Sequence, residues 1–292
     1  MKILVTGATG HFGKAAIASL LKKGVPGTDI AALVRDANKA TALQETGIDI
    51  RTGDYEDYAS LVKAFTGIDK LLLVSSNDLN NRSTQQANAV KAAREAGVKY
   101  ILYTSFVRKD ESAASPIAFV AQSHITTEKL IRDSGINYTI FRNNLYLDFV
   151  PMFIGEKVLE TGVYWPAGNT PGAYVLRDEM AEAAAHVLAG SGHENKEYNI
   201  SNTSAWNFQQ VADTISQASG KQIGYTSPSQ TEYKAVLTQA GVPDHYVALF
   251  AGFAEAIRLG EFDSATNSDL EKLLGRKPTS LVDYLMLVYR RK

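Results

Sequence analysis

The chain of 292 residues contains no cysteine, which excludes disulfide bridges, thiolate nucleophiles and metal sites built on cysteine. It also lacks an excess of charge. Its 30 basic and 31 acidic residues leave a formal net charge of −1, so no overall field attracts it to nucleic acid or to an anionic membrane. No apolar run approaches the roughly 18 residues of a membrane span, and the chain begins with a strand pattern instead of a targeting segment. These absences predict a cytoplasmic protein with no nucleic-acid or membrane partner.

The histidines are few and scattered, without the spacing of metal ligands, and we therefore expect no metal site. A serine in a G-x-S-x-G turn, which would indicate a hydrolase nucleophile, is also missing. What remains is an ordinary composition, 45% hydrophobic and 21% charged, with enough residues for one large domain or for one and a half.

Short apolar runs alternate with helical patterns over the first 145 residues. The predicted strands are 3–5, 30–34, 48–52, 71–74, 99–104 and 138–141, and the predicted helices between them include 37–45, 57–65, 83–96 and 117–134. Strands that alternate with helices imply right-handed crossovers. The sequence therefore predicts an α/β fold with a doubly wound parallel sheet, a Rossmann domain, whose ligands bind beyond the carboxyl ends of the strands.

Beyond residue 145 the alternation loosens. We predict a helix over 145–160, a loop or short strand over 164–172, a helix over 179–188 and a further strand over 197–200, followed by mostly helical chain. The predicted domains are therefore a Rossmann domain of residues 1–145, to which 175–202 return, and a smaller, mostly helical domain of 146–174 and 203–292. We expect the smaller domain to cover the cofactor crevice.

The first thirteen residues, MKILVTGATGHFG, are the stretch most typical of a known site. A short strand leads into a turn with Gly7, Gly10 and Gly13, and an amphipathic helix follows. Glycines let the backbone approach a dinucleotide pyrophosphate, and the helix N-terminus offers free N–H groups and a positive dipole end. We predict that this turn, with His11 and Phe12, binds a dinucleotide cofactor; a glycine-rich turn without a ligand is the alternative.

Arg35 ends the second predicted strand, 22 residues after Gly13. An acidic side chain at such a position binds a ribose 2′-hydroxyl and selects NAD, whereas an arginine can pair with a 2′-phosphate and select NADP. Lys39, one turn into the next helix, adds positive charge, while Asp36 could take the acidic role. Because Arg35 lies at the strand end itself, we predict NADP(H), with a solvated surface arginine as the alternative.

The remaining candidate cofactor contacts lie at the same rim of the predicted sheet. Asp54 and Tyr55 follow the third strand, where an adenine would lie, although turn chemistry explains this Gly-Asp pair equally well. Four more candidates follow the fourth and fifth strands: Ser75, Ser76, Thr104 and Ser105.

Many reductases of this architecture use a Tyr-x-x-x-Lys pair for proton transfer, and this chain lacks one. None of its fourteen tyrosines has a lysine four residues later. The corresponding helix instead carries His124 and Glu128, four residues apart and therefore on one helix face. His124 is the candidate catalytic residue, because an imidazole can donate a proton and a carboxylate can orient it. A lining role or an exposed helix face are the alternatives.

The missing pair also constrains the substrate. Reduction of a simple ketone leaves a strongly basic alkoxide that needs a placed proton donor, whereas reduction of a quinone leaves an anion stabilised by ring delocalisation. The enzyme then mainly positions a flat electrophilic ring and excludes water. Aromatic residues near the rim suit such a ring, although packing accounts for at least half of them: Phe106, Phe119, Tyr146, Phe149 and Trp165.

Several segments resemble the NmrA-like atypical short-chain dehydrogenases over nearly the whole chain: the glycine motif, 53–55 (GDY), 124–129 (HITTEK), 138–146 (YTIFRNNLY) and 192–199 (GHENKEYN). The resemblance implies NADPH as the donor and hydride transfer straight to quinones or dyes, without a tyrosine relay. It also implies that Asn143 and Tyr146 line the nicotinamide and substrate side. The dinucleotide contacts that it implies are Gly7, Thr9, Gly10, Gly13, Arg35, Ser75 and Thr104.

The favoured hypothesis is an NADPH-dependent oxidoreductase that acts on quinones or related planar electrophiles, with a small molecule as its partner. An NADP(H)-binding redox sensor without turnover is the alternative, because it shares the rim and needs no catalytic acid. A nucleotide-sugar epimerase or dehydratase is disfavoured, since that chemistry needs the tyrosine base. The oligomeric state is left open.

Overall fold

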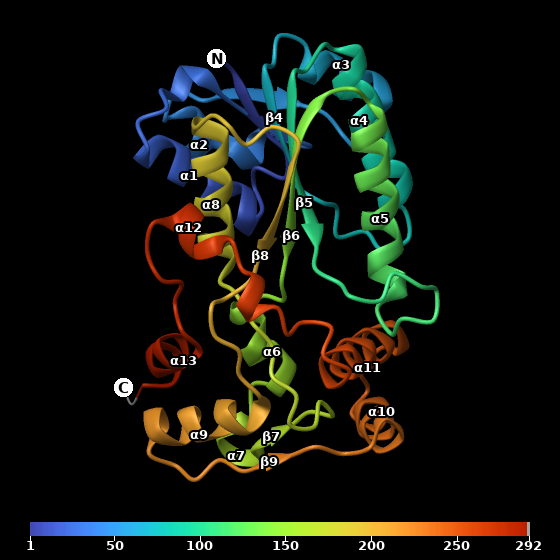
Figure 1. The fold of residues 1–292 in the computed structure, drawn as a ribbon, viewed down its shortest axis with the longest axis vertical. Coiled ribbons are helices and arrows are strands. Elements are labelled where there is room, and N and C mark those ends of the chain that lie inside the picture. Colours follow the sequence, from blue (N-terminus) through green and yellow to red (C-terminus); the bar gives the residue numbers. More distant parts are fainter. Residues whose placement is uncertain (291–292) are drawn as a thin grey trace.

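The computed structural model describes residues 1–290 of the chain. Its centre is a seven-stranded parallel sheet with the order β3-β2-β1-β4-β5-β6-β8 (Figure 1). Its strands are β1 (Ile3–Val5), β2 (Ile30–Val34), β3 (Asp49–Thr52), β4 (Lys70–Leu73), β5 (Tyr100–Phe106), β6 (Asn137–Asn143) and β8 (Lys196–Ile200). The strand order reverses between β1 and β4, which is where doubly wound sheets bind ligands. The predicted fold is confirmed.

Helices cover both faces of this sheet, with α1 and α8 on one face and α4 and α5 on the other (Figure 1). The helices of this lobe are α1 (His11–Lys22), α2 (Thr41–Gln44), α3 (Tyr58–Phe65), α4 (Arg82–Glu95), α5 (Ala118–Asp133), α8 (Arg177–Ala189) and α12 (Leu270–Leu274). Short 3-10 turns lie at Gly27–Asp29, Ala37–Ala40, Leu147–Phe149 and Ala265–Asn267.

The two faces of the sheet have separate cores. Successive side chains of a strand point to opposite faces. Ile3 and Val5 therefore pack with apolar residues of α1 and α8, and Leu4 packs with residues of α3 and α4. Since both faces are buried, the central strands read as continuous apolar runs, and this pattern made them predictable.

Two elements differ from the sequence-based prediction in ways that matter for the site. β5 and β6 continue past the predicted ends, and their register holds through the pair Phe106 and Asn143. The predicted helix over 145–160 is interrupted, because Gly155 has a φ of +82°, a value that a helix cannot contain.

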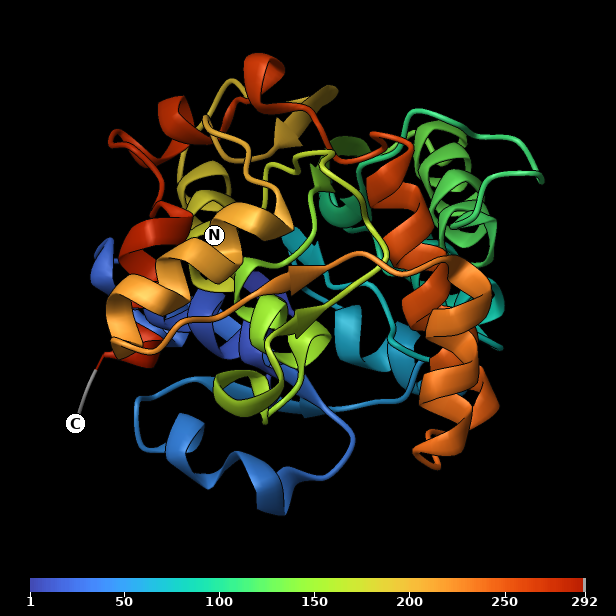
Figure 2. The same ribbon diagram turned by 90° about the horizontal axis from the view of Figure 1, so that it is seen from below.

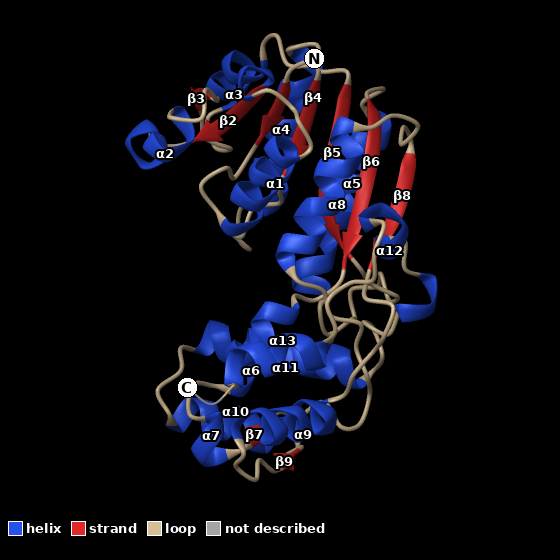
Figure 3. Cartoon of the chain, turned by 90° about the vertical axis from the view of Figure 1, so that its left-hand side faces the viewer, coloured by secondary structure: helices blue, strands red, loops and turns tan. Residues whose placement is uncertain are grey.

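A smaller lobe lies beyond the carboxyl ends of the strands (Figure 3). Its core is aromatic and centres on the fully buried Trp165, which stacks on Phe153. Figure 2 shows its two-stranded parallel sheet between helices. Its elements are α6 (Val150–Ile154), α7 (Val158–Thr161), β7 (Val163–Tyr164), α9 (Phe208–Ser219), β9 (Tyr225–Thr226), α10 (Gln230–Gln239), α11 (Asp244–Arg258) and α13 (Leu281–Tyr289). In contrast, α12 packs on the sheet lobe, with Leu270 and Leu273 in its core.

Hydrogen bonds join the two lobes at the loop that follows β5. Glu261, which follows α11, is buried and accepts hydrogen bonds from the backbone N–H groups of Lys109 and Asp110. Asn144, after β6, donates from its amide to the carbonyl of Phe262. Within residues 1–290, no helix is long and apolar enough to span a membrane.

Candidate functional site

The glycine turn lies between β1 and α1, at the switch point of the sheet. Gly7 has a φ of +58°, and its carbonyl accepts a hydrogen bond of 2.9 Å from the N–H of Gly10. A Cβ at Gly13 would lie 2.3 Å from the Gly7 carbonyl oxygen, so only glycine allows α1 to start this close to the turn. No side chain of the described chain caps α1, and its first turn holds no acidic residue. The turn therefore leaves a positive helix end open to an anion.

The other side chains of this turn have different surroundings. Thr9 is exposed, whereas Phe12 is buried in the core beneath α1. His11 lies with Nε2 2.7 Å from the Asp178 carboxylate on α8. Phe12 can thus offer a ligand only its backbone, while Thr9 and His11 lie at the surface of the turn.

Arg35 and Asp36 lie beyond the end of β2. Arg35 is exposed and has no hydrogen bond or ion pair among residues 1–290. The Asp36 carboxylate accepts the N–H of Asn38 and caps the following 3-10 turn, on which Lys39 is also exposed. The acidic neighbour is therefore occupied locally, whereas the guanidinium at the strand end is available for a ligand.

Tyr55 and Asp54, after β3, make contacts within the protein. The Tyr55 hydroxyl lies 2.6 Å from Thr6 Oγ1 and 2.8 Å from the Val74 carbonyl, and so it bridges the ends of β1 and β4. Burial raises the pKa of Tyr55, while the hydrogen bond to Thr6 acts in the opposite direction. The Asp54 carboxylate accepts the N–H of Glu56, a turn contact. Both residues border the switch point. Asp54 makes the turn contact that we gave as the alternative, whereas Tyr55 makes long-range contacts that the sequence did not predict.

Thr104 and Ser75 meet between β5 and β4. Thr104 Oγ1 accepts the N–H of Ser75 at 2.8 Å, and Ser76 accepts the N–H of Asp78. Ser105 points the other way, because neighbouring residues of a strand face opposite sides, and its hydroxyl donates to Glu128 at 2.6 Å. The structure brings Ser75 and Thr104 to the rim, but it directs the predicted contact Ser105 away from it.

Asn143 ends β6 beside Phe106. Its side chain is 2% exposed, and neither its amide nitrogen nor its amide oxygen has a partner among the described residues. Leaving a buried amide unpaired costs about 1–3 kcal/mol. A site that binds a polar ligand resolves this cost, because one amide can donate to a ligand and accept from it at once.

Tyr146 and Phe149 form an aromatic pair just beyond β6. Their ring centroids are 5.0 Å apart with an edge-to-face angle of 81°. The guanidinium of Arg177, paired with Asp148 at 2.5 Å, lies over both rings. This pairing satisfies Arg177 and places its side chain against two aromatic rings just beyond β6.

The other predicted aromatic residues divide between the rim and the cores. Phe106 is partly buried and contacts His124 and Phe262, with ring centroids 6.0 and 5.6 Å away. Phe119 is exposed at the start of α5, whereas Trp165 is fully buried in the smaller lobe. Phe106 thus lies where the two lobes meet, and Trp165 has a packing role.

His124 lies in a buried cluster with Arg82 and Tyr103, which we call the Arg82 cluster. Arginine can only donate, so His124 Nε2, 3.3 Å from Arg82 Nη1, is the acceptor. The proton is then on Nδ1, which donates to the Tyr103 hydroxyl at 2.7 Å. Burial, together with the charges of Arg82 and Arg108, holds the His124 pKa well below its usual value.

These contacts decide the role of His124. It is 4% exposed, so it is not on an exposed helix face, and both ring nitrogens have protein partners. A neutral imidazole without a free N–H cannot serve as the proton donor that we considered. Its ring instead accepts a hydrogen bond from Arg82, a buried arginine that sequence reasoning missed.

Glu128 lies one turn further along α5 in a second buried cluster, which we call the Glu128 cluster: Glu128, Ser105, Arg108, Arg132 and Arg142. Arg108 binds both carboxylate oxygens, at 2.8 and 3.0 Å. Burial alone would raise the Glu128 pKa, but the bonds from Arg108, Arg142 and Ser105 bring it well below the usual value. Glu128 is therefore a structural anion that holds α5 to β5 and β6, with no oxygen left to orient His124.

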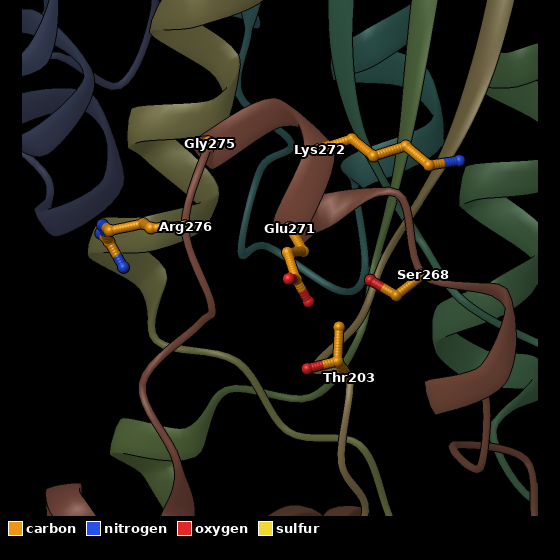
Figure 4. Close-up of a pocket in the computed structure, with 6 residues that line it drawn as sticks. All are labelled: Thr203, Ser268, Glu271, Lys272, Gly275 and Arg276. Carbon is orange, nitrogen blue, oxygen red and sulfur yellow. The ribbon is translucent and has the colours of Figure 1, made fainter.

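A hollow of about 460 Å³ opens on another side of the sheet lobe, next to α12 (Figure 4). Its lining is Thr203, Ser268, Glu271, Lys272, Gly275 and Arg276. Arg276 pairs with Glu179 and Glu182, each at 2.6 Å, so its charge is satisfied. The hollow takes no residue from the rim of β1, β4 and β5. Within residues 1–290, no group of three acidic or histidine side chains is arranged to hold a metal ion.

Comparison with known proteins matches the chain along nearly its full length. It is 40% identical over 283 residues to quinone oxidoreductase 2 of Escherichia coli K12, covering 96% of both chains. The solved structure of that protein with NADPH has a TM-score of 0.89 at 37% identity, covering 99% of this chain and 100% of the other.

The Citrobacter sp. triphenylmethane reductase complexed with NADP(H) has a TM-score of 0.88 at 39% identity, covering 98% of this chain and 99% of the other. The model of the NmrA-like family matches residues 1–285. The chain therefore belongs to the NmrA-like family.

Proposed function

We propose that this protein is an NADPH-dependent oxidoreductase that transfers a hydride to quinones or related planar electrophiles. The observation that carries the proposal is the glycine turn, in which Gly7, Gly10 and Gly13 bring an uncapped helix N-terminus to the switch point of the sheet. Two similar proteins were crystallised with NADPH or NADP(H), which supports this cofactor.

The residues present fit a phosphorylated dinucleotide. Thr9 and the three glycines of the turn would hold the diphosphate, and the free guanidinium of Arg35, supported by Lys39, would bind the 2′-phosphate. Ser75 and Thr104, at the ends of β4 and β5, would contact a nucleoside of the dinucleotide. The unpaired amide of Asn143 would face the nicotinamide end, with Tyr146 and Phe149 beside the substrate.

The substrate class follows from the proton chemistry. NADPH would supply the hydride, but the chain offers no tyrosine–lysine pair, and His124 has no free proton to give. A substrate whose reduced form is a stabilised anion, such as a quinone, can take its second proton from water. The residues of the rim then position a flat ring and exclude solvent.

Two measurements test the proposal. Purified protein should oxidise NADPH, followed by its absorbance, when a panel of quinones is added. Arg35→Ala should weaken NADPH binding by roughly 10- to 150-fold, the equivalent of a lost charged hydrogen bond of about 1.5–3 kcal/mol, and leave NADH binding nearly unchanged. Arg94→Ala, at an exposed arginine on the far end of α4, is the matched control.

Equal losses for the two cofactors would contradict the assignment of Arg35 to the 2′-phosphate. Intact NADPH binding without oxidation by any quinone would contradict the reductase and favour a cofactor-sensing regulator, for which binding to a protein partner would depend on the cofactor.

A further inference from the structure

Arg82 is a buried cation without an anion. It begins α4 and is 8% exposed. Of its guanidinium nitrogens, Nη1 donates to His124, and Nε is sealed from solvent with no partner among residues 1–290. Burial lowers the Arg82 pKa, and Asp78 is a carboxylate that acts on it only at longer range. The Asp78 oxygens accept from Asn80, Asn81 and Gln85.

An uncompensated buried charge is costly, so its retention calls for a ligand that balances it. Arg82 reaches His124, whose ring stacks beside Phe106 at 28° and 6.0 Å between centroids. Phe106 is paired in register with Asn143, another buried side chain with unpaired polar atoms. These side chains gather at the carboxyl ends of the adjacent strands β5 and β6 and at the helix that follows β4.

The surrounding groups support an anion and do not supply one. Tyr103 and His124 are neutral partners, since burial raises the pKa of Tyr103 and lowers that of His124. Tyr146, beyond β6, feels the charge of Arg82. Two other nearby guanidinium groups, those of Arg108 and Arg177, are already neutralised by Glu128 and Asp148. Among residues 1–290, Arg82 is thus a buried positive charge without an ion pair, near the residues to which the proposed function assigns the substrate.

We propose that Arg82 binds the anionic oxygen of the reduced substrate, and that His124 positions it for this task. The inference rests on the proposed function and names its substrate class. A quinone that gains a hydride, two electrons and one proton, becomes a hydroquinone anion, while the donor is oxidised and water supplies the second proton. A fixed guanidinium stabilises the oxygen on which this charge develops. A cationic dye gains the same hydride but becomes neutral, so the same charge opposes its binding.

The first test reads binding without turnover. 4-Nitrophenol is titrated with the protein loaded with NADP⁺, and its ionisation is followed by the absorbance of the phenolate. Arg82 should make the bound phenol ionise at a lower pH than the free phenol. Arg82→Gln should abolish this shift. Arg82→Lys keeps the positive charge and should retain part of the shift, and it serves as the test if the glutamine variant does not fold. Arg94→Gln, an exposed arginine of the same helix, should behave as the wild type.

The second test compares acceptors. Arg82→Gln should lower kcat/KM for benzoquinone by about 100-fold, the usual effect of removing one donor to a developing oxyanion, and lower it much less for the cationic dye malachite green. His124→Gln should give a smaller loss of the same selectivity, because it replaces the imidazole that holds Arg82 with a more flexible amide.

The outcomes separate this inference from the proposed function. An unchanged phenol pKa in the wild type, or a shift that survives in Arg82→Gln, would overturn the role of Arg82 even if quinones are reduced. Weakened binding of NADPH to Arg82→Gln without any acceptor would assign Arg82 to the cofactor and also overturn it. If the wild type shifts the ionisation of the phenol but reduces no quinone, the proposed reductase activity is contradicted, while the proposed anion site at Arg82 is supported.

Discussion

Helix α5 carries two buried polar clusters, one turn apart, and they differ in how their charge is balanced. In the Glu128 cluster a carboxylate that is 1% exposed accepts from Ser105 and from arginines on three elements. In the Arg82 cluster the arginine is 8% exposed, and among residues 1–290 its guanidinium has only a neutral imidazole as its partner. The saturated cluster has no capacity left for a ligand, whereas the unsaturated one is incomplete without one. The balance of charge, more than burial, therefore separates structural from functional polar groups here.

Breaking the saturated cluster should have the largest effect. Glu128→Gln removes the anion that Arg108 binds with both of its terminal nitrogens, and the Arg108 side chain is 2% exposed. Removal of one partner of a buried ion pair costs about 3–5 kcal/mol. Urea unfolding at neutral pH should show this loss. If the free energy of unfolding changes by less than about 1 kcal/mol, the Glu128 cluster contributes no more to stability than an exposed ion pair does.

The pH dependence of stability should report the Arg82 cluster. The folded protein keeps His124 neutral, but the unfolded chain protonates it below the ordinary pKa of 6.5. The unfolded state then binds more protons, so stability falls as pH drops below 6.5, by up to about 1.4 kcal/mol per pH unit.

His124→Gln should remove that part of the slope between pH 6.5 and 5, a range above the ordinary pKa of 4.5 of Glu128. Urea unfolding at a series of pH values measures the slope. His245→Gln, on the surface of α11, controls for the loss of an imidazole in general. Parallel curves for His124→Gln and the wild type would contradict a neutral, buried His124.

The opposite sign is expected for the unpaired cation. Arg82→Met replaces an uncompensated charge by an apolar side chain, so the free energy of unfolding should stay constant or rise by up to about 2 kcal/mol. Thermal and urea unfolding of the protein without ligand would show it. A loss above 3 kcal/mol would place Arg82 with Glu128 among the groups that hold the fold together.

The smallest effect is expected at the edge of the saturated cluster. Glu111 pairs with Arg108 at 2.9 Å, but its side chain is 54% exposed. Glu111→Gln should change the free energy of unfolding by at most about 0.5 kcal/mol. It is therefore the matched control for Glu128→Gln. An equal loss of unfolding free energy in both variants would mean that removing either partner of Arg108 has the same effect, whether that partner is buried or exposed.

Much of the sheet could be predicted from the sequence, because strands buried on both faces are apolar without interruption. The glycine turn and Arg35 were predictable for a related reason, since both follow such strands directly. The error at Ser105 arose from the length of β5. With the strand predicted to end at 104, Ser105 was treated as loop, and the alternation of side chains that turns it toward Glu128 was not applied.

The roles of His124 and Glu128 could not be read from their spacing. Four residues place them on one face of α5, but that face is buried against β5, where the partners come from distant segments. The sequence around Arg82 contains no pattern that would indicate a functional role for it. An arginine at the start of a helix is ordinarily solvated, and only tertiary packing reveals that this one is enclosed without a carboxylate.

Tyr55 has a consequence for the position of the glycine turn, where we propose that the coenzyme binds. The Tyr55 phenol adds to the hydrogen bonds by which Thr6 joins the end of β1 to the end of β4, and the glycine turn follows β1 directly. Phenylalanine at this position would keep the ring but remove the phenol from this junction, leaving only the bonds that Thr6 makes to Leu72 and Val74. We expect coenzyme affinity to fall in this variant through a shift of the glycine turn, because the Tyr55 hydroxyl itself is already engaged by protein atoms.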